Sequence, residues 1–183
     1  MNSNKELQVG GLTFVPFITE DMISARVAEL AAEIEKEYEG SNPLYVVILN
    51  GSFMFASDFL RQLSGAVDTQ FVRLASYNNT ESTGKVRQII GLADTEIEGR
   101  EIVVIEDIVD TGTTMHYLVP DLFNKGAESV ELCSLLFKPD KLQFTDATPK
   151  YAGFVIPNKF VLGYGLDYNG AGRNLKEIYK LKS

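Results

Sequence analysis

The sequence has one cysteine, one histidine and no long hydrophobic run, and each shortage excludes a class of protein. Cys133 alone cannot form an intramolecular disulfide, so we expect it to be a small buried residue. One cysteine and one histidine also cannot make a Cys/His zinc site. The longest apolar runs, such as residues 44–49, fall far short of the ~20 residues of a membrane helix. The first ten residues lack the apolar core of a signal peptide, so we expect a cytoplasmic protein with no membrane partner.

Positive charge is also scarce. The 183 residues carry a formal net charge of −8, with 17 Lys and Arg against 25 Asp and Glu. Binding to the phosphate backbone of a nucleic acid requires a basic surface, so we expect no nucleic-acid partner. A small anionic substrate is compatible with this charge, because a local positive pocket can form on an acidic protein.

The pattern of apolar residues predicts an α/β fold. Residues 20–38 repeat apolar side chains at helical spacing after Thr19, which can cap a helix. Apolar runs at 44–50, 68–77, 101–106 and 129–137 are typical of strands, and the segments 53–63 and 113–125 favour helices. A further strand at 85–92 would return from a polar loop and make a hairpin arm. Alternating strands and helices predict a parallel-sheet core with crossover helices.

The chain changes character after Lys138, where prolines and glycines interrupt it. We expect residues 139–183 to leave the sheet and to form a small hood together with residues 1–17. The core would then comprise residues 20–138, and residues 1–183 would make a single domain.

Residues 102–114 are the most informative segment, because an apolar strand leads into two acids and then a turn rich in threonine. Ligands of open α/β sheets bind at the carboxyl ends of the strands. Gly112 lets backbone amides approach a phosphate, and the helix N-terminus that follows favours negative charge. Hydroxyl donors come from Thr111, Thr113 and Thr114. Glu106 and Asp107 can accept hydrogen bonds from sugar hydroxyls. The segment predicts a sugar-phosphate site rather than a solvated loop that only caps a helix.

Residues 106–114, Glu-Asp-Ile-Val-Asp-Thr-Gly-Thr-Thr, resemble the phosphoribosyl-pyrophosphate signature of type I phosphoribosyltransferases. The Glu-Asp opening, with Asp110 four positions after Glu106, is similar to the hypoxanthine-guanine branch. The resemblance runs from about Phe14 to the C-terminus. It implies the fold of that family and a Mg²⁺-dependent salvage reaction, in which phosphoribosyl pyrophosphate and a 6-oxopurine base give a nucleotide. The family also suggests a homodimer or homotetramer.

The resemblance implies roles for residues along the whole chain. Asp110 would be the general base that takes the purine N7 proton, and Glu106 and Asp107 would bind the ribose. The phosphate would be held by Asp110, Thr111, Gly112, Thr113 and Thr114. The pyrophosphate would meet Asn50, Gly51 and Arg173. The purine would meet Lys138, Phe160, Val161 and Asp167. The metal ligands would be Asp167, Glu106 and Asp107, and a mobile lid would begin at Ser76 and Tyr77.

Two alternatives and one departure accompany this resemblance. The enzyme could prefer xanthine, which is also a 6-oxopurine, or the chain could be a nucleotide-sensing regulator without activity. Asp110 and the acidic overall charge argue against the regulator. Many relatives carry Lys or Arg where this chain has Asn50, which removes a charged contact to pyrophosphate. His116 is expected to be a helix-face residue without a chemical role.

Overall fold

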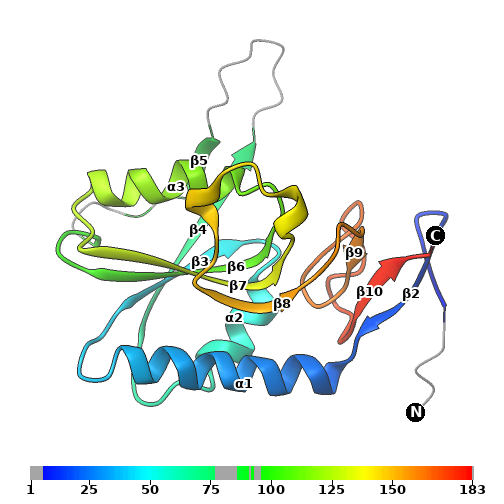
Figure 1. The fold of residues 1–183 in the computed structure, drawn as a ribbon, viewed down its shortest axis with the longest axis horizontal. Helices are drawn as coiled ribbons and strands as arrows, with labels where there is room; N and C mark the ends of the chain where they lie inside the picture. Colours follow the sequence, from blue (N-terminus) through cyan, green and yellow to red (C-terminus); the bar gives the residue numbers. More distant parts are fainter. Residues whose placement is uncertain (1–5, 77–85, 91, 93–95, 183) are drawn as a thin grey trace, which may run out of the picture.

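A six-stranded sheet forms the centre of the molecule in the computed structural model, which describes residues 6–76, 86–90, 92 and 96–182 (Figure 1). Its strand order is β5-β4-β3-β6-β7-β8. The strands are β3 (Leu44–Leu49), β4 (Asp68–Ser76), β5 (Val86–Ile90), β6 (Glu101–Val109), β7 (Ser129–Phe137) and β8 (Tyr151–Val155). All neighbours are parallel except β5, which runs antiparallel to β4 at one edge. The predicted α/β fold class is confirmed.

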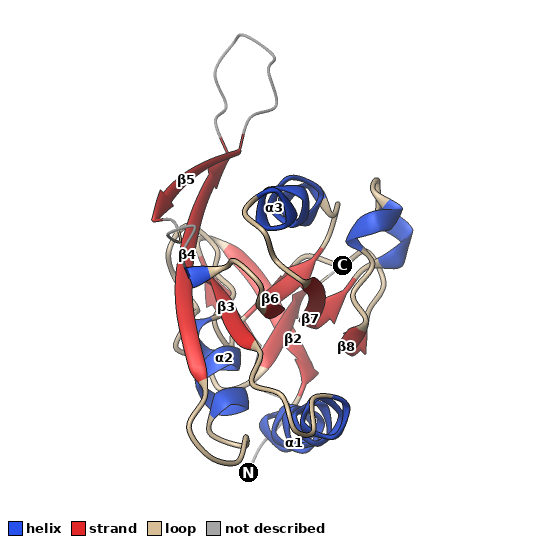
Figure 2. Ribbon diagram, turned by 90° about the vertical axis from the view of Figure 1, so that its left-hand side faces the viewer, coloured by secondary structure: helices blue, strands red, loops and turns tan. Residues whose placement is uncertain are grey.

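Helices cover both faces of this sheet (Figure 2). Helices α1 (Glu20–Glu37) and α2 (Phe53–Leu60) lie on one face, and α3 (Thr113–Asn124) lies on the other. A sheet covered on both sides requires apolar side chains on both sides of its central strands. In β3, Tyr45 and Val47 pack into the core under α1 and α2, whereas Val46 and Ile48 pack into the core under α3.

Helix α1 begins where the sequence predicts. The hydroxyl oxygen of Thr19 accepts a hydrogen bond from the Met22 amide at 3.3 Å. The buried residues of the helix recur at helical spacing and are Ile23, Val27, Leu30, Ala31 and Ile34. The helix therefore buries one face against the sheet and leaves the other in solvent. None of the described helices is long and apolar enough to cross a membrane.

A smaller antiparallel sheet joins the two ends of the chain beside the main sheet (Figure 1). Its order is β1-β2-β10-β9, with β1 (Leu7–Val9), β2 (Leu12–Ile18), β9 (Val161–Leu162) and β10 (Ile178–Leu181). Strand β10 pairs with both β2 and β9, so the N-terminal and C-terminal segments are held by shared backbone hydrogen bonds.

The prediction that the chain leaves the main sheet after Lys138 is wrong for residues 151–155. These residues form β8, which pairs in parallel with β7 at the edge of the sheet. The connection contains two 3-10 helices, η2 (Pro139–Lys141) and η3 (Thr145–Ala147), instead of an α-helix. The prolines prevent an α-helix in this connection but do not end the sheet. The short apolar segment that follows pairs with the free edge of β7.

Several helices and strands also begin or end at residues other than those predicted. Strand β6 continues to Val109, because its pairing with β7 extends to Val109↔Phe137, so Glu106 and Asp107 lie inside the strand. Helix α2 ends at Leu60, three residues earlier than predicted. Strand β5 begins at Val86 and ends at Ile90. Of the two predicted lid residues, Ser76 ends β4, and Tyr77 lies outside the described residues.

Candidate active site

A hollow of about 90 Å³ opens at the carboxyl end of β6, lined by Glu106 and residues 108–115. The turn from β6 into α3 forms its wall. The Thr111 and Thr113 hydroxyls are 2.9 Å apart, and the Thr113 amide points to the Thr111 hydroxyl at 3.4 Å. The hollow thus combines hydroxyl groups with the N-terminal end of a helix, which suits a phosphate group.

Position 112 requires glycine, both because of its backbone conformation and because a side chain would have no space there. It has φ +81°, a left-handed conformation that glycine adopts readily. A Cβ at this position would lie 2.7 Å from Ala147 Cβ and 3.0 Å from Leu142 Cδ1. The loop that connects β7 to β8 therefore packs directly on the turn, and the Gln143 amide donates to the Thr111 carbonyl at 3.0 Å.

Asp110 and two lysines form a charged group beside this turn. Lys141 donates to Asp110 Oδ2 at 3.1 Å, and the Lys138 Nζ lies 3.7 Å from the same oxygen. Asp110 Oδ1 is shielded from solvent and has no hydrogen-bond partner among the described residues. Lys138 is only 5% exposed, and burial lowers the pKa of its ammonium group while Asp110 opposes that shift. The buried ammonium group of Lys138, a donor, thus lies beside a carboxylate whose Oδ1 atom is a free buried acceptor.

Lys141 is a site residue that the sequence analysis missed. Helix η2 brings it there, because Lys138 precedes Pro139 and the Lys141 amide donates to the Lys138 carbonyl at 3.2 Å. Proline at the first position of a helical turn, with lysines three residues apart, was the signal in the sequence.

A second group of residues forms around the loop between β3 and α2. An ideal Cβ on Gly51 would lie 1.5 Å from Asp107 Oδ2, so the backbone of Gly51 lies directly against that carboxylate. The Asp107 Oδ1 atom accepts from the Ile108 amide at 2.7 Å. A Cβ on Gly165 would lie 2.0 Å from the Gly51 carbonyl oxygen. Close backbone contact therefore joins the β3–α2 loop to residues 163–166.

Arg173 ties the C-terminal segment into this second group. It donates to the Gly165 carbonyl at 2.7 Å and forms an ion pair with Asp167 Oδ1 at 2.6 Å. The other Asp167 oxygen accepts from the Gly170 amide at 2.7 Å. The structure thus brings Gly51, Asp107, Asp167 and Arg173 together. Asn50 precedes Gly51 and is exposed, and the cis peptide bond of this loop lies between Leu49 and Asn50.

The acidic pair of β6 is electrostatically unfavourable. Burial raises the pKa of Glu106 well above its ordinary value, and the neighbouring charge of Asp107 adds to the shift. Burial also raises the pKa of Asp107, although the Glu106 and Ile108 hydrogen bonds and the charge of Arg173 oppose it. The Glu106 Oε2 atom has no partner among the described side chains and backbone groups. Such a pair favours a cation or hydrogen-bond donors as a ligand.

We expect Glu106→Gln to stabilise the protein by about 1–2 kcal/mol at pH 7, the scale of an unsatisfied buried polar group. A carboxyl whose pKa is raised by folding costs stability only where it ionises in the unfolded chain. The gain should therefore vanish below the ordinary glutamate pKa of 4.5. Urea unfolding at pH 4 and pH 7, without added magnesium or nucleotide, measures it. The exposed Glu128→Gln is the control, and an equal gain there would contradict the explanation.

Val161 begins β9 of the smaller sheet, and Phe160 directly precedes that strand. The Phe160 ring is 44% exposed and meets Tyr168 edge-on at a centroid distance of 5.7 Å. It also contacts the buried Phe14 ring at 6.0 Å. Val161 is buried in β9 and pairs with Lys180. Phe160 thus offers an exposed aromatic face, while Val161 has only backbone groups to offer.

Cys133 and His116 lie outside the site, Cys133 buried and His116 on a helix as the sequence predicts. Cys133 is buried in the main core, and burial raises the pKa of its thiol. His116 lies on α3, stacks on Phe144 at 4.0 Å and lies 2.9 Å from Asp146 Oδ2. It therefore helps to hold the β7–β8 connection against α3.

Comparison with known proteins gives one consistent result. The model of the phosphoribosyl transferase domain family matches residues 19–169. A hypoxanthine-guanine phosphoribosyltransferase of Lactococcus lactis is 40% identical over 90% of this chain and 89% of its own length. A hypoxanthine-guanine-xanthine phosphoribosyltransferase of Tritrichomonas foetus is 37% identical over 89% of this chain and 88% of its own. The crystal structure of a hypoxanthine phosphoribosyltransferase from Staphylococcus aureus superposes with a TM-score of 0.85 at 39% identity, covering 91% of this chain and 90% of that one.

Proposed function

Because the chain belongs to the phosphoribosyltransferase family, we propose that it salvages purines by transferring the 5-phosphoribosyl group of phosphoribosyl pyrophosphate to hypoxanthine and guanine. The products are the nucleotide monophosphate and pyrophosphate. The observation that carries this proposal is the buried Lys138 beside the free Oδ1 of Asp110. A 6-oxopurine presents an acceptor, O6, next to a donor, N7–H, and this edge is complementary to that donor–acceptor pair.

Asp110 is the general base in this proposal. The N9 atom of the purine forms a bond to C1 of the ribose while the bond from C1 to pyrophosphate breaks, and the N7 proton passes to Asp110. The free Oδ1 receives this proton, because Lys141 holds Oδ2. Lys138 donates to O6 and so disfavours adenine, which carries an amino group at that position.

The proposal assigns the remaining substrate groups to the two clusters and to residues that the family resemblance implies. The 5′-phosphate occupies the hollow formed by Asp110, Thr111, Gly112, Thr113 and Thr114. The pyrophosphate meets the backbone of Asn50 and Gly51 and the Arg173 guanidinium, which can form two parallel hydrogen bonds. Phe160 stacks on the purine, and Val161 and Asp167 lie at its far edge. Ser76 and Tyr77 begin a lid that excludes water.

In this proposal Glu106, Asp107 and Asp167 would hold Mg²⁺ together with substrate oxygens, because no three acidic side chains of the described residues form a metal site by themselves. Magnesium prefers oxygen ligands from one or two carboxylates together with substrate oxygens. Glu106 Oε2 is buried and unpartnered among the described residues, and burial disfavours the charge of both neighbouring acids. A divalent cation offsets this cost. When bound, Mg²⁺ neutralises charge on the leaving pyrophosphate, while Glu106 and Asp107 accept hydrogen bonds from the ribose hydroxyls.

The cellular context is proposed from the family and the composition. We place the enzyme in the cytoplasm, as a homodimer or homotetramer, with no nucleic-acid or membrane partner. Size-exclusion chromatography with light scattering measures the oligomeric state directly.

Nucleotide formation with hypoxanthine, guanine, xanthine and adenine, each with phosphoribosyl pyrophosphate and Mg²⁺, tests the proposal. We expect inosinate and guanylate to form and adenylate to be absent. The Tritrichomonas relative carries xanthine in its name, so preferred formation of xanthylate would instead support the xanthine alternative. Activity on adenine alone would overturn the role given to Lys138.

Lys141→Met should lower kcat/KM for hypoxanthine by about 10-fold, the scale of one charged hydrogen bond. Lys138 already pairs with the same oxygen at 3.7 Å, and without Lys141 it is the nearest cation among the described residues. A tighter ion pair between Lys138 and Asp110 would then occupy both groups that meet the purine edge. Lys141→Arg should retain most activity, and Lys36→Met, in the exposed last turn of α1, is the control. Unchanged kinetics of Lys141→Met would remove Lys141 from the site.

A further inference from the structure

One irregular row crosses three strands of the main sheet and consists of Asp107 in β6, Leu135 in β7 and Gly153 in β8. Strands β6 and β7 pair in one register on both sides of Asp107 and Leu135, and the described ladder skips these two residues. The ladder between β7 and β8 skips Leu135 and Gly153 in the same way. Because the register is unchanged beyond the gap, the three strands share the irregularity.

Side chains change faces at the irregular row. In β6, Ile105 and Ile108 both pack into the core under α1 and α2. In β7, Cys133 and Leu136 both do so. The members of each pair are three positions apart, and an odd spacing places two side chains on opposite faces of a regular strand. Each strand therefore carries one additional residue on this face, and the register is unchanged because neighbouring strands do so at the same row.

Gly153 makes the irregular row possible at the edge of the sheet. A Cβ at this position would lie 2.5 Å from the Leu135 carbonyl oxygen, so a larger residue would push β8 away from β7. Close approach of backbone is a common reason for glycine inside a strand.

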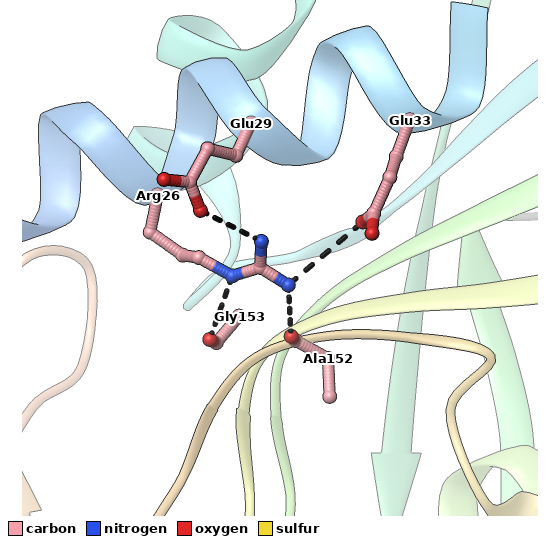
Figure 3. Close-up of polar contacts among 5 residues, drawn as sticks. All are labelled: Arg26, Glu29, Glu33, Ala152 and Gly153. Atoms are coloured by element: carbon pink, nitrogen blue, oxygen red, sulfur yellow. Dashed lines mark hydrogen bonds and ion pairs between the residues drawn. The ribbon is translucent and has the colours of Figure 1, made fainter. Parts of the chain in front are cut away.

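Arg26 of α1 holds the outer end of the irregular row (Figure 3). Its Nη2 donates to the Ala152 carbonyl at 2.9 Å, and its Nε donates to the Gly153 carbonyl at 3.0 Å. Successive carbonyls of a regular strand point in opposite directions, so only an irregular backbone presents both to one guanidinium. Glu29 at 2.9 Å and Glu33 at 3.8 Å orient the guanidinium from the helix side.

Asp107 is the inner end of the irregular row and also a member of the site. One of its carboxylate oxygens accepts from the Ile108 amide, and the other faces the Gly51 backbone. Because two of its contacts are made by backbone and a third by Glu106 of the same strand, the direction of this carboxylate depends on the path of β6 at the irregular row.

We propose that Arg26 is a positioning residue for Asp107 and acts through the irregular row. Without its guanidinium, two adjacent carbonyls of β8 lose their charged donors, and the edge strand relaxes toward regular pairing. Strands β7 and β6 share the row, so the Asp107 carboxylate turns with them. The inference rests on the proposed function, in which Asp107 binds the ribose of phosphoribosyl pyrophosphate.

Arg26→Met and Gly153→Ala perturb the irregular row from two different residues, and Arg26→Lys is a milder change if either fails to fold. We expect each to raise KM for phosphoribosyl pyrophosphate by about 3–30-fold, the range of coupling through a packed network. KM for hypoxanthine should stay unchanged, because Asp110 and Lys138 lie outside the row. The matched control is Arg100→Met, since Arg100 also donates to a backbone carbonyl, of Asn42 at 3.1 Å, and to Asp68 at 2.9 Å.

Two results would overturn the inference. One is a KM for phosphoribosyl pyrophosphate that is unchanged in the Arg26 and Gly153 variants. The other is an equal rise in KM for phosphoribosyl pyrophosphate in Arg100→Met, when urea unfolding shows that this control has lost as much stability as the Arg26 variant. A wild-type enzyme that forms no inosinate would refute the proposed function itself, so the two failures are distinguishable.

Discussion

Asp110→Asn is expected to lower kcat for inosinate formation by about 10²–10⁴-fold, the usual contribution of a general base. The asparagine side chain has the same shape, so it can still contact Lys138 and Lys141. It cannot accept the N7 proton, because its amide is not basic. We expect the affinity for inosinate, measured by isothermal titration calorimetry, to change little in comparison.

Asp140→Asn is the matched control for this prediction. Asp140 is exposed on the same 3-10 helix as Lys141 and undergoes the same chemical change. Its turnover should equal that of the wild type. Retained turnover in Asp110→Asn would show that another group takes the proton. Asp110 would then not be the general base, and the match of Lys138 and Asp110 to the purine edge would not explain the reaction.

Gly51→Ala is expected to reduce kcat/KM for phosphoribosyl pyrophosphate by about 100-fold, the penalty that a displacement near 1 Å can cause in an active site. The added Cβ would lie 1.5 Å from Asp107 Oδ2 and 2.6 Å from its Cγ. Either the Asp107 carboxylate rotates away or the loop moves away from Gly165, and both changes disturb the groups that would meet ribose and pyrophosphate. Gly51 is not among the glycines with positive φ, so the substitution tests space alone.

Gly65→Ala provides the comparison for Gly51→Ala. Gly65 has φ +75° and open space around its Cβ position, so alanine there strains the backbone without meeting a neighbour. We expect that variant to lose stability and to keep the KM for phosphoribosyl pyrophosphate. Normal KM in Gly51→Ala would mean that the loop adapts, and that close contact between Gly51 and Asp107 is not needed for binding.

Much of the fold could be predicted because it depends on local patterns. The spacing of Ile23, Val27 and Leu30 predicts the buried face of α1, and the apolar runs predict the central strands. Strand β8 could not be predicted, because five residues between prolines carry little local signal and pair only because β7 offers a free edge. The extension of β6 through the acidic pair also depends on its neighbour β7.

The candidate site likewise has residues that could be predicted from local sequence and residues that could not. Residues 106–114 are contiguous, so a sugar-phosphate site can be proposed from their order alone, including a turn that would bind the phosphate. The role of Asp110 is implied by the family resemblance. Lys141 and Arg26 could not be assigned from the sequence. Lys141 reaches Asp110 from 31 positions along the chain, and Arg26 reaches β8 from 127 positions.

The sequence by itself predicted a sugar-phosphate site, because the proposed groups follow one another at the end of one strand and the start of one helix, and the resemblance of this segment to a family signature implied the reaction class. The tertiary structure alone decided how those groups are oriented: which oxygen of Asp110 is free, what lies against Asp107, and what holds the edge of the sheet. Orientation depends on contacts between distant segments, and such contacts form only when the hydrophobic cores on both faces of the sheet have closed.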